Sequence, residues 1–211
     1  PFMILQNDGV ATGYFFTSFD GATEVLEDAR RDSTQKKMET ADTWARARIS
    51  AIPLDFALKL SKARPKCTAQ NGNKYATVYD FIPSSLDLDD ATSIDTSGIF
   101  TERGRVPLFY FENLVINKEG GDKRFPVYLQ KTDLFKEWKK QFPEERPPPL
   151  KVLDLVDTFN AMLRPGSKDE RFNNLILIPP QESRKAANEC EKSRGTASPY
   201  QMGQMIAVGG K

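Results

Sequence analysis

The chain has 211 residues, 39% of them hydrophobic, which is enough to form the core of one compact domain or of two small halves. Thirty Lys and Arg residues against 29 Asp and Glu residues give a net charge of +1, so the chain lacks the overall positive charge that attracts nucleic acid or anionic membranes. Its apolar runs are all shorter than the ~18 residues that a membrane-spanning helix needs.

The sequence contains no histidine, which removes the most common catalytic base and the imidazole ligands of most zinc and iron sites. Asp154 and Asp157 stand three residues apart at an expected helix start, where acidic residues usually cap the helix rather than catalyse. The glycine pairs 120–121 and 209–210 fit neither a Walker loop nor a dinucleotide-binding loop. The sequence therefore predicts a protein that is not an enzyme, with no catalytic residues, cofactor or metal site.

The chain has two cysteines, Cys67 and Cys190, too few and too far apart for a zinc knuckle or a disulfide framework. Nothing in their spacing brings them together, so we expect free thiols, with one disulfide as the alternative. The chain begins at Pro1 rather than at Met, and we therefore expect a processed form or a fragment.

In the first half, alternating apolar residues predict strands and apolar residues at helical spacing predict helices. The expected elements are strands at 2–5 and 14–16, a helix at 19–31, a strand at 49–52, a helix around Phe56 and Leu60, and a strand at 75–81. The first two strands flank an Asn-Asp-Gly turn and should form a hairpin. The polar run 32–43 either extends the first helix or forms a loop.

The second half begins after residues 84–105, which are rich in Asp, Ser and Thr and are expected to be irregular. The expected elements are strands at 108–111 and 125–129, a helix over 132–142, a strand at 151–153, a helix over 155–163 and a strand at 174–178.

Both halves thus have the order strand, strand, helix, strand, helix, strand, and both stop at proline, after Ile82 and after Ile178. An offset of 113 residues superposes the inward positions of the first helices, whereas the closing strands match at an offset of 96. We predict an α/β (α+β) fold in which two similar halves form a pseudo-symmetric duplicated fold; chance alternation is the alternative. The expected boundaries are 1–91 for the first half-repeat, 92–105 for a linker, 106–187 for the second half-repeat and 188–211 for a tail.

Two groups of apolar residues are candidates for partner binding: Tyr200, Met202, Met205 and Ile206 in the tail, and Phe109 and Phe111 in a strand. Methionine-rich segments adapt to different partners, although the tail is equally compatible with a final edge strand or a frayed end. The two phenylalanines share one face of their strand, and if both faces of the sheet are covered they belong to the core, which is the favoured interpretation.

Several segments resemble, in the same order, the twenty-two-kilodalton subunit family of the inner-envelope chloroplast translocon, which occurs in plastids and cyanobacteria. They are GYFFTSFDGATEVLEDARRDS (13–33), AIPLDFALKL (51–60), VPLFYFENL (106–114), RFPVYLQKTDLFKEW (124–138), LKVLDLVDTFNAML (150–163) and NNLILIPP (173–180). The resemblance extends to about Ser183. It implies two similar halves, a soluble protein without a cofactor or a catalytic motif, and a plastid (chloroplast) location in the intermembrane space, lumen or stroma.

The resemblance also implies a chaperone-like role in protein import, with precursor proteins and translocon subunits as partners. The polar insert 32–43 and the tail 194–211 depart from the family pattern. They leave open a second function, that of a structural subunit docked peripherally on a photosynthetic membrane complex. A hidden enzyme would require a cleft with strongly perturbed carboxylates.

Overall fold

The computed structural model describes residues 2–5, 10–36, 41–63, 66–68, 74–117, 123–163 and 174–194. The chain divides into two compact units: unit 1 comprises Pro1–Ile82 and Glu182–Lys211, and unit 2 comprises Pro83–Gln181. The chain thus leaves unit 1 at the first of the two proline stops and returns at Glu182, two residues after the second. Independent half-repeats at 1–91 and 106–187 remain a prediction.

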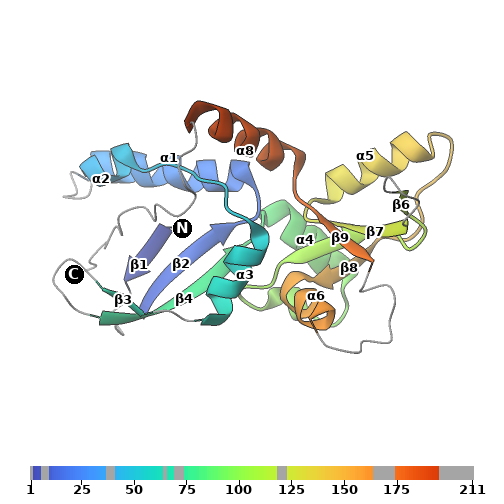
Figure 1. Ribbon diagram of the computed structural model, residues 1–211, viewed down its shortest axis with the longest axis horizontal. Coiled ribbons are helices and arrows are strands. Elements are labelled where there is room, and N and C mark those ends of the chain that lie inside the picture. The colour runs from blue at the N-terminus through green and yellow to red at the C-terminus, as the bar shows by residue number, and fades with distance from the viewer. Residues whose placement is uncertain are drawn as a thin grey trace. The chain divides into compact units, whose positions relative to one another are not determined.

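Unit 1 is built on a four-stranded sheet whose strands have the order β1-β2-β4-β3 (Figure 1). Its elements are β1 (Phe2–Leu5), β2 (Val10–Phe16), α1 (Phe19–Gln35), α2 (Ala41–Arg46), α3 (Leu54–Ala63), β3 (Lys66–Thr68), β4 (Lys74–Ile82) and, from its second residue, α8 (Gln181–Arg194). The expected hairpin is confirmed, because β1 pairs antiparallel with β2. The central strands β2 and β4 run parallel, with Phe16 opposite Ile82.

One face of this sheet is packed with aromatic rings. Phe15 stacks on Tyr79 at a centroid distance of 5.2 Å and contacts Phe81 at 5.5 Å, and all three side chains are buried. Side chains two residues apart on a strand share a face, so the alternation in β2 and β4 produces this cluster. Helix α1 begins after Ser18, whose side chain accepts a hydrogen bond from the Gly21 N–H.

The strand expected at 49–52 is wrong, since these residues, all of which the structure describes, lie in an irregular segment between α2 and α3. Arg30 of α1 explains the difference: its guanidinium donates hydrogen bonds to the carbonyl groups of Trp44 and Ala47. The chain before this segment is therefore held by α1 rather than by a neighbouring strand. Helix α2 was not expected, whereas the extension of α1 to Gln35 was one of the two alternatives for the polar run.

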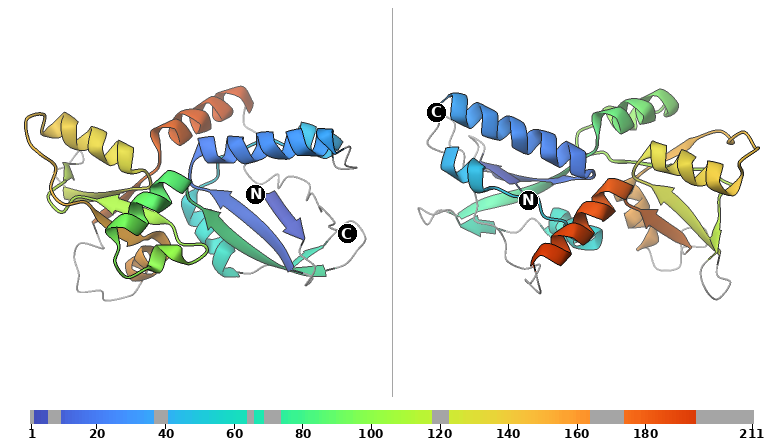
Figure 2. Two further views of the ribbon diagram at one scale, coloured as in Figure 1. Left: turned by 180° about the vertical axis from the view of Figure 1, so that it is seen from behind. Right: turned by 90° about the horizontal axis from the view of Figure 1, so that it is seen from above.

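Unit 2 contains a five-stranded sheet with the path β6-β7-β5-β8, and β9 pairs with β7 (Figure 2). Its elements are α4 (Ser85–Ile94), the 3₁₀ helix η1 (Ile99–Thr101), β5 (Pro107–Tyr110), β6 (Ile116–Asn117), β7 (Lys123–Tyr128), α5 (Lys131–Gln141), β8 (Lys151–Asp154), α6 (Leu155–Met162) and β9 (Leu175–Ile178). The pairing of β7 with β9 is parallel and the other pairings are antiparallel.

Helix α4 corrects the expectation that residues 84–105 are irregular. Ser84 caps its start, because the Ser84 hydroxyl accepts from the Asp87 N–H and donates to the Asp87 carboxylate. Leu88, Ala91 and Ile94 recur at helical spacing and pack into the core of unit 2. Most of the polar residues of the segment lie on the exposed face of the helix. Because they outnumber the apolar residues, the helical spacing of the apolar residues was not recognised in the sequence.

The core of unit 2 covers one face of its sheet with α4 and α5. Its buried members are Ala91, Phe100, Phe109, Phe111, Leu114, Tyr128, Leu134 and Trp138. Phe111 meets Trp138 edge to face, at 5.3 Å and 73° between ring planes. Leu108 and Val127 point to the opposite face and are also buried, so both faces of this sheet are covered.

The two closing strands end in the same way within their own units. Ile82 O accepts a hydrogen bond from Thr17 N at 3.0 Å, and Ile178 O accepts one from Leu129 N at 3.2 Å. Ile82 lies opposite Phe16, and Ile178 lies opposite Tyr128. Placing Phe16 on Tyr128 shifts the sequence by 112 residues and also places the first residue of α1 on the first residue of α5. The offset expected for these helices was 113 residues. The mixed α and β architecture is as predicted, and the internal duplication remains a prediction. Within the described ranges, every helix is too short or too polar to cross a membrane.

Candidate functional site

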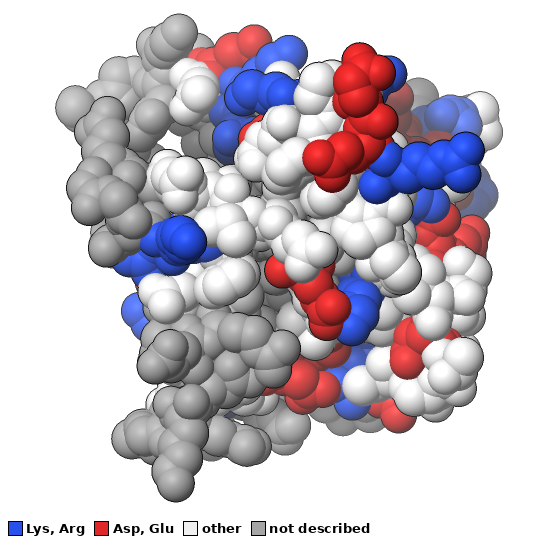
Figure 3. Space-filling view, turned by 90° about the vertical axis from the view of Figure 1, so that its right-hand side faces the viewer, with Lys and Arg blue, Asp and Glu red and all other residues white. Residues whose placement is uncertain are grey.

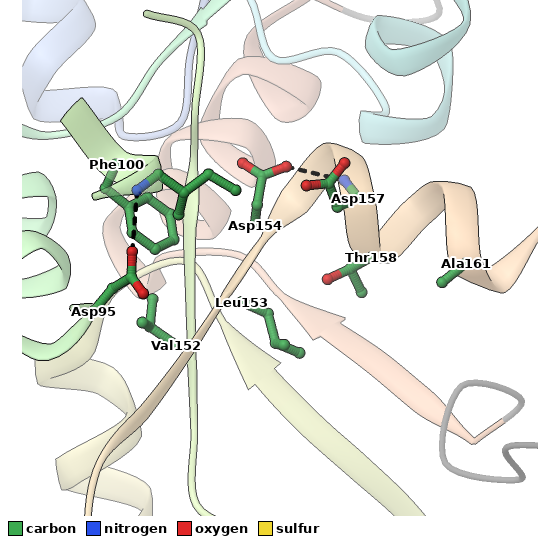
Figure 4. A pocket seen from close by; sticks show the side chains of 9 residues that line it. Asp95, Phe100, Val152, Leu153, Asp154, Asp157, Thr158 and Ala161 are labelled. Carbon is green, nitrogen blue, oxygen red and sulfur yellow. Dashed lines mark hydrogen bonds between the residues drawn. The ribbon is translucent and has the colours of Figure 1, made fainter. Parts of the chain in front are cut away.

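Unit 2 contains a pocket of about 290 Å³ (Figure 4). Its lining comes from three segments that are distant in sequence: the turn after α4, strand β8 and helix α6. The lining residues are Asp95, Ile99, Phe100, Val152, Leu153, Asp154, Asp157, Thr158 and Ala161. Most of this surface is apolar, and its carboxylates come from the turn and from the start of α6.

The pocket lies at the edge of the sheet. Strand β8 ends the strand path, and its sheet neighbour is β5. Val152 and Leu153 point to opposite faces because successive side chains of a strand alternate. A pocket that touches both must therefore reach around the strand edge, with Phe100 on one side and Thr158 on the other.

Each side-chain oxygen of Asp154 accepts a hydrogen bond from a backbone N–H group. Its Oδ1 accepts from the Asp157 N–H at 2.9 Å, which caps α6, and its Oδ2 accepts from the Val106 N–H at 3.1 Å. Arg105 Nη1 lies 3.4 Å from Oδ1, and the Asp154 side chain is only 2% exposed. The predicted capping role of Asp154 is thus confirmed.

Arg105 connects the carboxylates on one side of the pocket. It donates to Glu102 Oε2 from Nε and Nη2, at 3.0 and 2.9 Å, and to Asp157 Oδ2 at 2.8 Å. The hydrogen bond to Glu102, with the charges of Asp154 and Asp157, raises the pKa of Arg105 above its usual value. The guanidinium therefore stays charged and offsets part of the negative charge there.

Asp95 organises the turn on the other side. Its carboxylate accepts from the Ser97 hydroxyl at 2.7 Å and from the backbone N–H groups of Ser97 and Ile99 at 3.1 and 3.2 Å. The turn passes through Gly98 at φ 79°, a conformation that favours glycine. The hydrogen bonds from Ser97 lower the pKa of Asp95, so this carboxylate remains ionised at neutral pH.

The carboxylates that line the pocket all have hydrogen-bond partners within the protein. The three lining carboxylates stabilise a helix start, an arginine and a turn. Across the described ranges, no three Asp, Glu or Cys side chains are grouped as metal ligands would be. What the pocket offers is a place for an apolar group beside negative charge.

Phe109 and Phe111, two of the six predicted partner-binding residues, are 0% and 2% exposed and belong to the core of unit 2. This placement agrees with the interpretation of these phenylalanines as core residues. Tyr200, Met202, Met205 and Ile206 lie outside the described residues, as do the side chains of both cysteines. A role for the six residues in partner binding remains a prediction.

The charged surface of unit 2 consists largely of neighbouring opposite charges. On the face that Figure 3 presents, acidic and basic side chains lie close together with uncharged surface between them. Ion pairs of this kind in unit 2 join Lys131 to Asp90, Lys136 to Asp133 and Lys151 to Glu112. The pair of Lys151 and Glu112, both exposed, is screened by solvent and contributes little to stability.

Comparison with known proteins gave a family and several similar solved structures, two of which are described below. The model of the Tic22-like family matches residues 3–189. Among curated proteins, none matches the sequence. Tic22 from Plasmodium falciparum has a TM-score of 0.58 and 18% identity, over 92% of this chain and 89% of that one. Anabaena Tic22, described as a protein of protein transport, has a TM-score of 0.63 and 17% identity, over 86% and 80% of the two chains. At these identities the likeness is one of fold.

Proposed function

The chain belongs to the Tic22-like family, and from this premise we propose that it acts in protein transport as a chaperone-like protein that holds unfolded segments of precursor proteins. The observation that supports this proposal is the apolar pocket of unit 2, whose carboxylates all accept hydrogen bonds from other groups of the protein. The proposed partners are precursor proteins and translocon subunits, and the proposed location is the plastid.

The size of the pocket supports weak and reversible binding. At about 290 Å³ it lies at the lower limit of the volumes that hold a small-molecule ligand, and it suits one or two apolar side chains. Burial of one such side chain contributes about 1.5–3 kcal/mol. A dissociation constant of 1 mM corresponds to about 4 kcal/mol, so a single occupied pocket holds a segment only transiently. Transient capture is what a protein that passes its client onward needs.

Aggregation of a chemically unfolded client protein, followed by light scattering, tests this function. Ala161 lines the pocket from α6, and the substitution Ala161→Phe fills it with a ring. We expect the parent protein to suppress scattering and the variant to lose most of that effect. Ala45→Phe is the matched control, because Ala45 is an exposed helical residue of unit 1.

Urea unfolding of both variants separates a filled pocket from a damaged fold. If Ala161→Phe remains folded and protects the client as well as the parent does, the pocket is not the binding site. The alternative function, a structural subunit on a photosynthetic complex, predicts no suppression by any of the three proteins and stoichiometric retention in the purified complex.

A further inference from the structure

Strand β8 has one edge occupied by β5 and the other directed at the pocket. Leu153 lies opposite Leu108, and the Leu155 N–H bonds to Val106 O at 2.9 Å. In an antiparallel ladder the backbone groups of alternate residues face the partner strand. Leu153 and Leu155 therefore face β5, and the backbone N–H and C=O groups of Val152 and the N–H of Asp154 face the pocket side. The Asp154 C=O belongs to the first turn of α6, because Asp154 is the N-cap of that helix.

The lining of the pocket suits the side chains of a strand added beside β8. A neighbouring strand lies about 4.8 Å away in the hydrogen-bonding direction, and its side chains alternate between the two faces of the sheet. The pocket follows the edge of β8 and is bounded by Ile99 and Phe100 on one face and by Thr158 and Ala161 on the other. Apolar side chains of an added strand would meet an apolar wall on either face.

The charge around this edge is negative. Glu102 and Asp157 have 61% and 59% of their side chains exposed, and both bond to Arg105, which also approaches Asp154. Together with Asp95, these groups comprise four carboxylates and one guanidinium. A segment with basic residues is therefore favoured here over one with acidic residues. Targeting segments of organelle precursors are rich in Arg and poor in acidic residues.

We propose that a basic, extended segment of a client protein adds to β8 as a further strand, along the edge that no other described strand occupies, with an apolar side chain in the pocket. Strand addition gives affinity through main-chain hydrogen bonds and selectivity through pockets for alternate side chains. The inference rests on the proposed function and deepens it, because it specifies the conformation and the charge of the captured segment.

Fluorescence anisotropy with labelled nine-residue peptides tests the charge preference. In one peptide Leu alternates with Lys, and in the other Leu alternates with Glu. We expect the lysine peptide to bind roughly ten times more tightly at low salt, with the difference shrinking as salt is raised. Equal affinity of the two peptides would overturn the charge preference.

A set of lysine peptides, each with one backbone nitrogen methylated, tests strand addition. Methylation removes an N–H donor, so only the residues whose N–H faces β8 should be sensitive. We expect binding to weaken at one central position, whose N–H lies opposite the Val152 C=O, and not at the positions on either side of it. Equal sensitivity at neighbouring positions, or no sensitivity, would exclude an added strand.

Charge-reversal variants of the protein test where the peptide binds. Asp157→Lys reverses a charge beside the pocket and should weaken the lysine peptide about tenfold. Asp55→Lys is the matched control, since Asp55 is an exposed carboxylate of unit 1 and, like Asp157, is paired with a basic side chain. Equal effects of the two variants would contradict binding at β8. If the parent protein suppresses aggregation but shows neither the charge preference nor the methylation pattern, the proposed function stands and the inference of strand addition fails. If the parent protein does not suppress aggregation, the proposed function itself is wrong.

Discussion

Ser183 Oγ accepts a hydrogen bond from the backbone N–H of Phe19 at 3.0 Å, across 164 residues of sequence. Phe19 is the first residue of α1, so this bond satisfies an N–H that lacks a partner within its helix. In unit 2, Asp87 Oδ1 accepts in the same way from Lys131 N, the first residue of α5, at 3.2 Å. Ser183 and Asp87 are each the third residue of the helix that follows a proline stop. This correspondence is what a duplication predicts.

Ser183→Ala should lower the free energy of unfolding by about 1 kcal/mol, because it leaves the Phe19 N–H without its acceptor. Urea unfolding followed by circular dichroism measures the change. Ser93→Ala is the control, since Ser93 is exposed in α4 and its hydroxyl bonds only within that helix. Its effect should stay within about 0.5 kcal/mol. Equal effects of the two substitutions would show that the Ser183 bond contributes nothing.

Asp87→Asn should change how stability depends on pH. Burial raises the pKa of Asp87 in the folded protein, so the protonated carboxyl group is more compatible with the fold than the ionised carboxylate. This contribution is present below the unfolded pKa of about 4 and is lost as pH rises through the folded pKa. The unfolding free energy of the parent, relative to Asp87→Asn, should therefore fall as pH rises from 4 toward 7.

Asp55→Asn provides a control of opposite sign. The hydrogen bond from Lys59 lowers the pKa of Asp55, so its contribution is present above the unfolded pKa and is lost as pH falls through the folded pKa. Urea midpoints at half-unit pH steps measure both slopes. Parallel slopes for the two variants would contradict the assignment of a raised pKa to Asp87.

Arg105→Gln should destabilise unit 2 by about 1–2 kcal/mol, because it removes charge-assisted hydrogen bonds near the buried Asp154 carboxylate. The loss stays moderate since Asp154 keeps its two backbone donors. Lys151→Gln removes an exposed cation that pairs with Glu112 and should cost less than about 0.5 kcal/mol. If the two substitutions destabilise equally, Arg105 has no special role in holding the pocket.

Much of the architecture could be predicted because its signal is local. Apolar alternation located β5 and β7, helical spacing located α1 and α5, and the prolines after Ile82 and Ile178 marked the strand ends. Helix α4 was missed because its apolar stripe is sparse among acidic residues, although the Ser84 and Asp87 pair is a capping signal. The absence of a strand at 49–52 depends on the distant Arg30.

The pocket could not be predicted for a similar reason. Its lining joins the turn at Asp95, the edge of β8 and the start of α6, which only the fold brings together. The sequence did indicate that Asp154 caps a helix, and this local role is correct. It could not indicate that the same capped helix start follows the last strand in the described sheet path, since strand order is a property of long-range pairing.

Deletion of residues 198–211 should leave the free energy of unfolding unchanged and weaken partner association more than tenfold. Tyr200, Met202, Met205 and Ile206 are the predicted partner-binding residues of this segment, and burial of each against a partner would contribute about 1.5–3 kcal/mol. Recovery of partners from solubilised plastid membranes on immobilised protein measures the effect. A full-length variant with these four residues changed to Ser controls for chain length and should behave like the deletion. Undiminished recovery with either protein would show that the tail does not bind.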